Sequence, residues 1–373
     1  MRIGYDAKRF FHNTTGLGHY SRTLIQLLLR SYEDLEVVLF DGNPVLNELT
    51  QPICSAPQVS TVSLDYPGWY YRSINLDKSV HKANLDIYHG LSNALPLKKN
   101  LNVPYVVTIH DLLYRFFPND FSLFDRTIYH IKTSQAIKNA EIIIAISEAT
   151  KKSILDLFPV AEKKIKVIYQ SYDPVFDTPV LPADLEAVLK KYKLPGNYNY
   201  YVGSVTYRKN LKVILEAMLR QSADQRLPLL IAGDGNNYLK EINTFIHQNK
   251  LSQLVFHLPH LPRSIVRMLY THANAVIYPS LGEGFGLPVL EGIAANVPVI
   301  TSVNSSMPEA GGDVAIYFNP DQPEELASIL NSLNKESHLK QTAIKREKHL
   351  LKFHPRETAE KYYREIYQSL CKK

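Results

Sequence analysis

Residues 279–291 read PSLGEGFGLPVLE, and this stretch decides how the second half of the chain folds. The apolar run 275–278 before it predicts a short buried strand. Gly282, Gly284 and Gly286 then allow a tight turn and a close approach of the backbone to a ligand. The stretch therefore predicts a strand that ends in a glycine-rich loop.

A helix should follow the loop, because Pro288 stands near its first position, where a missing N–H is tolerated. The free N–H groups and the positive dipole end of such a helix start suit a phosphate. Glu283 lies in the loop, and Glu291 lies about one turn inside the helix, near Leu287 in angular position. A phosphate site flanked by two carboxylates fits a ligand that is both phosphorylated and rich in hydroxyls.

The composition bounds the class of protein. The chain has 373 residues, 45% hydrophobic and 21% charged, which is typical of a globular protein and favours two domains. No apolar run approaches the roughly 18 residues of a membrane span, and residues 1–6 read as a strand, so we expect no signal peptide. Two cysteines, Cys54 and Cys371, leave no disulfide framework and fit a reducing cytoplasm. The formal charge of +6 is compatible with a phosphorylated substrate or an anionic membrane surface.

Short apolar segments alternate with longer amphipathic ones, which predicts parallel α/β sheets. We expect strands near 2–6, 36–41, 59–64, 86–89, 104–109, 141–146, 165–169, 199–203, 228–233, 253–258, 275–278, 297–301 and 314–318. We expect helices near 17–31, 121–139, 147–157, 209–221, 237–249, 263–273, 287–295, 322–334, 337–352 and 356–371. Residues 171–197 carry four prolines, so we place a domain boundary there. The sequence predicts two Rossmann-like halves with sites beyond the carboxyl ends of their strands.

A second glycine motif, Gly16-Leu17-Gly18, opens the first long helix and can take a phosphate or a sugar. Followed by Ser21, and with Asp41 ending the next strand, it mimics a dinucleotide fingerprint. Against that interpretation, the glycines come about ten residues after the strand and the third glycine is a serine. A plain structural turn is the other alternative.

Two more strand ends carry chemistry. His110 and Asp111 follow strand 104–109, where a histidine can position a hydroxyl or carbonyl, or else be half-buried beside a capping Asp. Arg208 and Lys209 stand at a helix start, where cations are unfavourable unless a bound anion reverses the balance. A solvated basic patch is the alternative there.

Other polar stretches have simpler interpretations. Turn chemistry explains Asp234, and helix capping explains Ser305 or Ser306 with Pro308 and Glu309. There is no Asp-x-Asp, no His/Cys cluster at metal spacing and no P-loop, so nothing in the sequence calls for a metal.

Four motifs in order along the chain carry a resemblance to glycosyltransferase family 4, the retaining GT-B enzymes. They are Gly16 through Tyr20, Thr108 through Leu112, Val202 through Leu211, and the Glu-x7-Glu stretch 279–291. The resemblance implies two Rossmann-like domains facing each other across a cleft. It places an acceptor-binding domain at 1–175, a nucleotide-sugar domain at 176–355 and a C-terminal helix crossing back at 356–373.

The same resemblance implies roles for the motif residues. Arg208 and Lys209 would hold the donor diphosphate, Glu291 the ribose, and Glu283 the transferred sugar, with His110 beside it. His110, Glu283, Arg208 and Lys209 are thus the candidate catalytic residues. The donor site would also take in Gly16, Gly18, Ser204, Leu258, Gly284, Phe285, Gly286 and Leu287. His19 and Asp111 would meet the acceptor. Many members have Arg where this chain has Ser204, so the phosphate charge would rest on Arg208 and Lys209.

The run from Leu281 through Asp313 is similar to bacterial mannosyltransferases of polysaccharide and O-antigen assembly. GDP-mannose is therefore the favoured donor, with UDP-sugars as the alternative; the donor is a substrate, and no cofactor is expected. The acceptor would be a saccharide or a polyprenyl-diphosphate-linked saccharide. The stretches 68–72 and 114–118 mix aromatics with cations, which suits a sugar or a lipid headgroup layer as well as ordinary packing.

We expect a cytoplasmic enzyme, with peripheral contact at the inner face of the cell membrane left open and no nucleic-acid partner. Two alternatives stay open: a GT-B-fold nucleotide-sugar epimerase, and a non-catalytic nucleotide-sugar-binding protein.

Overall fold

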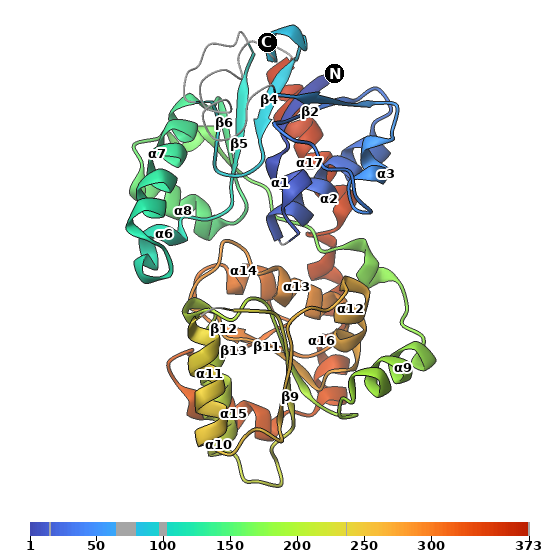
Figure 1. The fold of residues 1–373 in the computed structure, drawn as a ribbon, viewed down its shortest axis with the longest axis vertical. Helices are drawn as coiled ribbons and strands as arrows, with labels where there is room; N and C mark the ends of the chain where they lie inside the picture. The colour runs from blue at the N-terminus through green and yellow to red at the C-terminus, as the bar shows by residue number, and fades with distance from the viewer. Residues whose placement is uncertain (15, 65–79, 97–102, 236, 372–373) are drawn as a thin grey trace. The chain divides into compact units, whose positions relative to one another are not determined.

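The computed structural model describes residues 1–14, 16–64, 80–96, 103–235 and 237–371 (Figure 1). The chain forms two compact units. The first comprises Met1–Ser171 together with His354–Lys373, and the second comprises Tyr172–Phe353. The C-terminal residues therefore belong to the same unit as the N-terminus, although the whole second unit separates them in the sequence.

The first unit is built on a seven-stranded sheet with the order β3-β2-β1-β4-β5-β6-β7. Its strands are β1 Arg2–Asp6, β2 Glu36–Asp41, β3 Val59–Ser63, β4 Ile87–Gly90, β5 Tyr105–Ile109, β6 Ile142–Ala145 and β7 Ile165–Val167. Every pair is parallel. The strand order reverses between β1 and β4, and open α/β sheets bind ligands beyond the carboxyl ends of their strands at such a switch point.

Helices pack on both faces of this sheet. Their bounds are α1 Lys8–His12, α2 Gly16–Ser31, α3 Gln51–Cys54, α6 Leu113–Phe116, α7 Leu123–Asn139, α8 Glu148–Leu157, α17 Pro355–Lys361 and α18 Gln368–Cys371, with a π-helical segment Tyr362–Tyr367 between the last two. α2 and α17 pack side by side and share one core with the strands (Figure 1). Residues of α7 and α8 pack in the other core. Ser147 is the N-cap residue of α8, and its side chain accepts a hydrogen bond from Thr150 N.

The second unit repeats the plan with six parallel strands in the order β10-β9-β8-β11-β12-β13. Their bounds are β8 Asn199–Val202, β9 Leu229–Ala232, β10 Val255–Leu258, β11 Ala275–Tyr278, β12 Val299–Ser302 and β13 Ile316–Phe318. The switch point lies between β8 and β11. The predicted Arg208–Lys209 and Glu283 motifs follow these two strands, so the topology brings them to one place.

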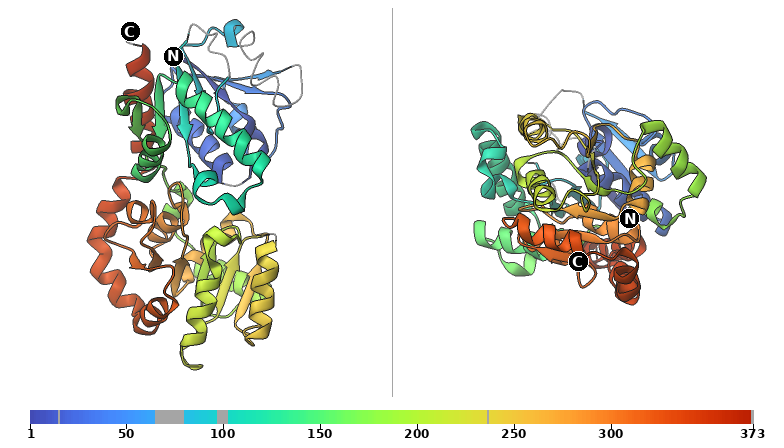
Figure 2. Two further views of the ribbon diagram at one scale, coloured as in Figure 1. Left: turned by 90° about the vertical axis from the view of Figure 1, so that its left-hand side faces the viewer. Right: turned by 90° about the horizontal axis from the view of Figure 1, so that it is seen from below.

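The helices of the second unit flank its sheet, as Figure 2 shows from two further directions. They are α9 Pro182–Tyr192, α10 Leu211–Arg220, α11 Asn237–Gln248, α12 Arg263–His272, α13 Leu287–Ala294, α14 Met307–Gly311, α15 Pro323–Ser332 and α16 Lys335–Leu351. The predicted α/β class with two parallel sheets is confirmed. Across the described ranges, no helix has the length and apolarity to cross a bilayer.

Candidate functional site

The glycine-rich loop leaves β11 after Tyr278 and enters α13 at Leu287. Gly286 is the N-cap residue and has φ 112°, which favours glycine. A Cβ atom there would lie 2.6 Å from Met307 Cε, so the methionine side chain would have to shift to make room for it. Gly284 and Phe285 of the loop are buried, whereas Leu287 is half-buried. The sequence-predicted order of strand, loop and helix is present in the structure.

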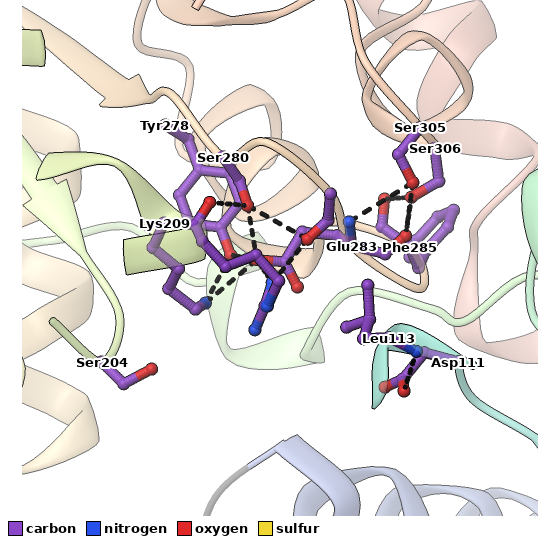
Figure 3. Close-up of polar contacts among 12 residues, drawn as sticks. Asp111, Leu113, Ser204, Lys209, Tyr278, Ser280, Glu283, Phe285, Ser305 and Ser306 are labelled. Carbon is purple, nitrogen blue, oxygen red and sulfur yellow. Dashed lines mark hydrogen bonds and ion pairs between the residues drawn. The ribbon is translucent and has the colours of Figure 1, made fainter. Parts of the chain in front are cut away.

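Glu283 lies at the centre of a cluster of charged and polar side chains (Figure 3). Its Oε1 lies 2.7 Å from Arg208 Nη1 and 3.4 Å from Lys209 Nζ. Tyr278 and Ser280 donate their hydroxyl hydrogens to the same oxygen over 2.8 and 2.9 Å. Lys209 also donates to the Tyr278 hydroxyl oxygen over 2.6 Å. Five side chains from the ends of β8 and β11 therefore form one hydrogen-bonded cluster.

The cluster is largely buried and combines two basic side chains with one carboxylate. The side chains of Arg208, Lys209 and Glu283 are 14%, 12% and 13% exposed. Burial alone would raise the pKa of Glu283. The charges of Lys209 and Arg208 outweigh that effect and lower the pKa to about 2. Burial lowers the pKa of Lys209, and Glu283 opposes that shift. Two cations and one carboxylate leave a net charge of +1, which can attract a phosphate.

The structure changes the argument made from the helix start. Arg208 and Lys209 lie in a 3-10 turn, Tyr207–Lys209, and α10 begins after Asn210. The sequence predicted a bound anion to offset two cations in this place. Glu283 supplies one negative charge from within the protein, so the two cations are compatible with folding before any ligand binds.

A second loop supports the first. Ser305 and Ser306 donate hydrogen bonds to the Glu283 carbonyl oxygen over 2.7 and 3.0 Å, and Ser306 also reaches the Phe285 carbonyl oxygen over 2.7 Å. Ser306 is the N-cap residue of α14, as the sequence predicted, but its side chain makes no cap hydrogen bond. Both hydroxyls are turned to the glycine loop instead, which Figure 3 shows.

Glu291 lies on α13 and is 5% exposed. Its Oε1 is 2.6 Å from Arg263 Nη2, and its Oε2 accepts a hydrogen bond from Tyr270 over 3.2 Å. Arg263 Nε also pairs with Asp173 Oδ2 at 2.8 Å. Sequence reasoning missed Arg263, although a signal existed: Arg263 is the first residue of α12, and it too is a cation at a helix start.

The remaining donor candidates lie at neighbouring strand ends. Ser204 is exposed, and its carbonyl oxygen accepts a hydrogen bond from Tyr201 over 2.9 Å. Leu258 ends β10 and is half-buried. The predicted turn role of Asp234 agrees with its 2.7 Å hydrogen bond from Gly235 N. These residues stand at the carboxyl edge of the second sheet, as Arg208 and Glu283 do.

In the first unit, His110 follows β5 and is 5% exposed. Its Nε2 lies 2.8 Å from the Leu91 carbonyl oxygen, so Nε2 carries the hydrogen. Its Nδ1 accepts from Gln170 Nε2 over 3.1 Å. Burial, with a smaller contribution from the charge of Arg9, lowers the pKa of His110 to about 4. The ring is therefore neutral at physiological pH, with one donor and one acceptor atom.

The other candidate site residues of the first unit come from the motif Gly16 through Tyr20 and from Asp111. Gly18 is buried and donates its N–H to Asn13 Oδ1 over 3.0 Å, and a Cβ atom there would lie 1.7 Å from the Asn13 carbonyl oxygen. Gly16 is exposed and His19 is half-buried. Asp111 Oδ1 accepts a hydrogen bond from Leu113 N over 3.2 Å.

The two aromatic stretches proposed for the acceptor have different outcomes. Residues 68–72 lie outside the described residues. Tyr114 of the second stretch is 4% exposed and belongs to the core, whereas Phe116 is 53% exposed. Within the part of the chain that the structure describes, no three His, Cys, Asp or Glu side chains form a group that could hold a metal ion.

Comparison with known proteins agrees with this arrangement. A family model described as Glycosyltransferase Family 4 matches residues 14–176, and one described as Glycosyl transferases group 1 matches residues 188–350. The chain is 26% identical over 363 residues to the O-antigen chain mannosyltransferase B of Escherichia coli, covering 90% of this chain and 92% of that protein. It is 25% identical over 337 residues to the O-antigen chain mannosyltransferase RfbU of Salmonella typhimurium, covering 88% and 90%.

A crystal structure of a glycosyltransferase from Rickettsia africae matches the fold with a TM-score of 0.75. That match has 19% sequence identity and covers 100% of this chain and 98% of the other. The two family models account for most of the chain and follow each other in the order of the two sheets. The chain therefore belongs to the glycosyltransferases of the GT-B fold, as an enzyme with a Glycosyltransferase Family 4 domain followed by a group 1 domain.

Proposed function

We propose that this glycosyltransferase acts with retention and moves a hexose, with mannose favoured, from a nucleotide-diphospho-sugar to a saccharide or lipid-linked saccharide. The observation that carries the proposal is the buried cluster of Arg208, Lys209 and Glu283 at the switch point of the second sheet. Its net positive charge is placed where an α/β sheet takes its ligand.

The leaving group explains why such a cluster is useful. In the proposed reaction the bond between the sugar C1 and the donor phosphate oxygen breaks, and the nucleoside diphosphate leaves with the bonding electrons. An acceptor hydroxyl oxygen forms the new bond to C1 on the same face, and its proton passes to a donor phosphate oxygen. Arg208 and Lys209 are fixed by Glu283 before substrate arrives, so they can stabilise the developing charge with little reorganisation. In this scheme the positive charge that the reaction needs comes from the protein itself.

The other site residues have proposed roles that fit their surroundings. Glu291, held by Arg263 and Tyr270, would accept the ribose hydroxyls. Nδ1 of neutral His110 would accept a hydrogen bond from a sugar hydroxyl in place of the one from Gln170. Nε2 would keep its hydrogen bond to the Leu91 carbonyl oxygen.

The donor and the process rest on the relatives. Two relatives that align over most of the chain are named as O-antigen chain mannosyltransferases. This supports GDP-mannose as donor and bacterial surface polysaccharide assembly as the process, with a UDP-sugar as the alternative.

We also propose peripheral contact with an anionic membrane from the cytoplasmic side. Phe116, Leu123, Phe124 and Ile131 on α6 and α7 are 53%, 76%, 74% and 51% exposed. Arg115 lies beside them in the sequence and is exposed as well. Apolar side chains with a cation suit a headgroup layer. Flotation with anionic vesicles at low salt tests this, and an absence of binding would contradict it.

The main experiment measures donor binding and turnover separately. A tight donor at one hundred times its Kd should stabilise the protein by about 2.7 kcal/mol, so a thermal-shift screen of GDP-mannose and UDP-sugars identifies it. With that donor, Lys209→Ala should lose at least ~2 kcal/mol of transition-state stabilisation. Lys212→Ala is the matched control, because the Lys212 side chain is 51% exposed and its contacts are with Glu216 on the same helix and with the Phe245 ring.

The alternatives give different results. A nucleotide-sugar epimerase would convert the donor without any acceptor, which product analysis detects. A non-catalytic binding protein would show the thermal shift with no turnover of any acceptor tried. Full activity in Lys209→Ala would overturn the proposed role of the cluster.

A further inference from the structure

A line of buried hydroxyl and imidazole groups crosses the first unit and is not explained by donor or acceptor binding. Its members are Tyr5, Tyr20, His89, Thr108, Tyr362 and Tyr367. Five of the six are fully or almost fully buried, and Tyr20 is 8% exposed. Buried polar groups in such a network are costly unless every member has a partner, so the line has a defined geometry.

The distances describe a continuous chain of hydrogen bonds. Tyr5 donates to the Tyr367 hydroxyl over 3.1 Å, and that hydroxyl lies 2.8 Å from His89 Nδ1. His89 Nε2 lies 2.9 Å from Thr108 Oγ1. These contacts fit one order of donation, in which Tyr367 donates to His89 and Nε2–H of His89 donates to Thr108. Burial, reinforced by the nearby His110, lowers the pKa of His89 to about 3, which keeps the ring neutral in this order.

The line then reaches Tyr20, the last residue of the motif Gly16 through Tyr20. Thr108 Oγ1 lies 2.9 Å from the Tyr20 hydroxyl, and the Tyr20 hydroxyl lies 2.6 Å from that of Tyr362. The Tyr20 ring meets the His110 ring edge-on, with centroids 4.7 Å apart and planes at 84°. Tyr20, which lies between Thr108 and Tyr362 in the line, therefore contacts the proposed sugar-binding histidine.

The π-helical segment explains how the C-terminal residues take part. Residues five apart in an α-helix lie about 140° apart around its axis, given 3.6 residues per turn. The wider i→i+5 turn of a π-helix brings them back toward one side. Tyr362 and Tyr367 bound this segment and are five residues apart, and both point into the same core. A regular α-helix would turn one of the two hydroxyls away from the line.

We infer that Tyr20 and Tyr362 are positioning residues for His110. Tyr362, in the C-terminal segment, is hydrogen-bonded to the Tyr20 hydroxyl. The Tyr20 ring packs edge-on against the His110 ring. The two nitrogens of that ring are hydrogen-bonded to Leu91 and Gln170. This inference rests on the proposed role of His110 at the transferred sugar. It adds that residues 362–367 help to fix the orientation of that ring.

The test uses the full chain with Tyr20→Phe and Tyr362→Phe, which keep the rings and remove the hydroxyls. Tyr362→Phe removes the hydrogen bond with Tyr20, so kcat should fall about fivefold. Tyr20→Phe also removes the hydrogen bond with Thr108, so its kcat should fall at least as far. The KM of the donor should change less than kcat, because the charged residues proposed to bind the donor, Arg208, Lys209 and Glu291, lie in the second unit. The imidazole nitrogens of His110, identified by their loss in His110→Asn, should shift in a spectrum of histidine-labelled protein.

Tyr363→Phe is the matched control. Tyr363 lies in the same π-helical segment, but its ring stacks on Tyr32 with centroids 3.6 Å apart. Its kcat and its His110 signals should match those of the wild type. A Tyr363→Phe variant that changes both as strongly as Tyr362→Phe would overturn the inference, since the effect would then belong to the segment as a whole.

The outcomes separate the inference from the proposed function. Unchanged His110 signals with kcat within twofold in both Tyr20→Phe and Tyr362→Phe would overturn the positioning role. Full turnover in His110→Asn would instead overturn the role of His110, whatever the spectra of the tyrosine variants show. If Tyr362→Phe folds poorly, the Tyr20→Phe spectrum decides the same question from the other side of the contact.

Discussion

The candidate site residues of the two units are fixed in place by different interactions. In the second unit, Arg208, Lys209 and Glu283 are charged, and the group has a net charge of +1. In the first unit, His110, Tyr20 and His89 are neutral and are held by hydrogen bonds and ring contacts. Arg208, Glu283 and His110 follow the carboxyl ends of parallel strands, whereas His89 lies within β4 and Tyr20 lies in α2.

The difference follows from what each region has to hold. A diphosphate leaving group brings several negative charges, which a prearranged cation pair can meet. A sugar hydroxyl is neutral and needs a donor and an acceptor at fixed positions, which a neutral histidine provides. If this comparison is right, the two regions respond differently to the loss of a charge, to acid and to the loss of a hydroxyl.

The largest expected effect comes from removing the carboxylate of the charged region. Glu283→Gln leaves Arg208 and Lys209 buried beside each other without a counter-charge, which should destabilise the second unit by about 3–5 kcal/mol. Calorimetry measures the loss. The control is Glu324→Gln, because Glu324 pairs with Arg220 at the surface with a 67% exposed side chain. Its loss should be far smaller, because solvent screens an exposed ion pair. Equal losses in the two variants would contradict the importance assigned to burial.

The next largest effect should be a difference in the stability of the two units as the pH falls. Folding lowers the pKa of His110 from 6.5 to about 4, so its stabilisation is present above pH 6.5 and is lost as pH falls toward 4. That loss is on the order of 3 kcal/mol. Glu283 has its pKa lowered from 4.5 to about 2, so its contribution is lost between pH 4.5 and 2. Hydrogen exchange at pH 5 should show the first unit weakened more than the second, in which burial also lowers the pKa of His338 and His349. The opposite order would break the comparison.

A smaller effect is expected from loosening Glu291, the second carboxylate of the charged region. Arg263→Gln removes the cation between Asp173 and Glu291 and leaves the Glu291 carboxylate less fixed. Donor KM should rise about tenfold with little change in kcat, since a binding contact shared by ground and transition states is weakened. Arg220→Gln, at an exposed pair, should leave KM unchanged. A fall in kcat alone would mean that Arg263 acts on the reacting sugar.

The smallest effect should come from the loop that supports the glycine stretch. Ser306→Ala removes hydrogen bonds to the carbonyl oxygens of Glu283 and Phe285, so stability should fall by about 1 kcal/mol. A thermal melt measures it. Ser332→Ala, at an exposed serine on α15, is the comparison variant and should change the melting temperature less. A normal melt for Ser306→Ala would mean that the Gly286 turn holds the loop without help.

The sequence revealed the charged region better than the neutral one, for a physical reason. Strand and helix positions follow from local periodicity, and the observed strands lie within the predicted ones to about two residues. Arg208, Lys209 and Glu283 could be proposed because cations at a helix start and a glycine loop with an acid are unusual in themselves. The network of Tyr5, His89 and Tyr367 could not, since buried tyrosines in apolar runs read as ordinary core.

The errors share a cause. Ser305 and Ser306 stand before Pro308 and Glu309, which is a local pattern for a cap, yet their partners lie in a loop twenty residues earlier. Arg263 likewise finds Glu291 and Asp173 across the fold. Local sequence rules describe a residue's own helix, whereas the choice between two partners depends on which strand ends the sheet order brings together.

The interrupted chain path of the first unit has a consequence for its synthesis. The chain leaves that unit after Ser171 and returns at His354. At 5–20 residues per second, a ribosome needs roughly 10–40 s to make the intervening residues and reach Tyr362. During that interval Tyr20 and His89 have been made, but the C-terminal tyrosines that complete their core have not. The nascent protein therefore completes its second unit first, and the histidine side of the enzyme matures last.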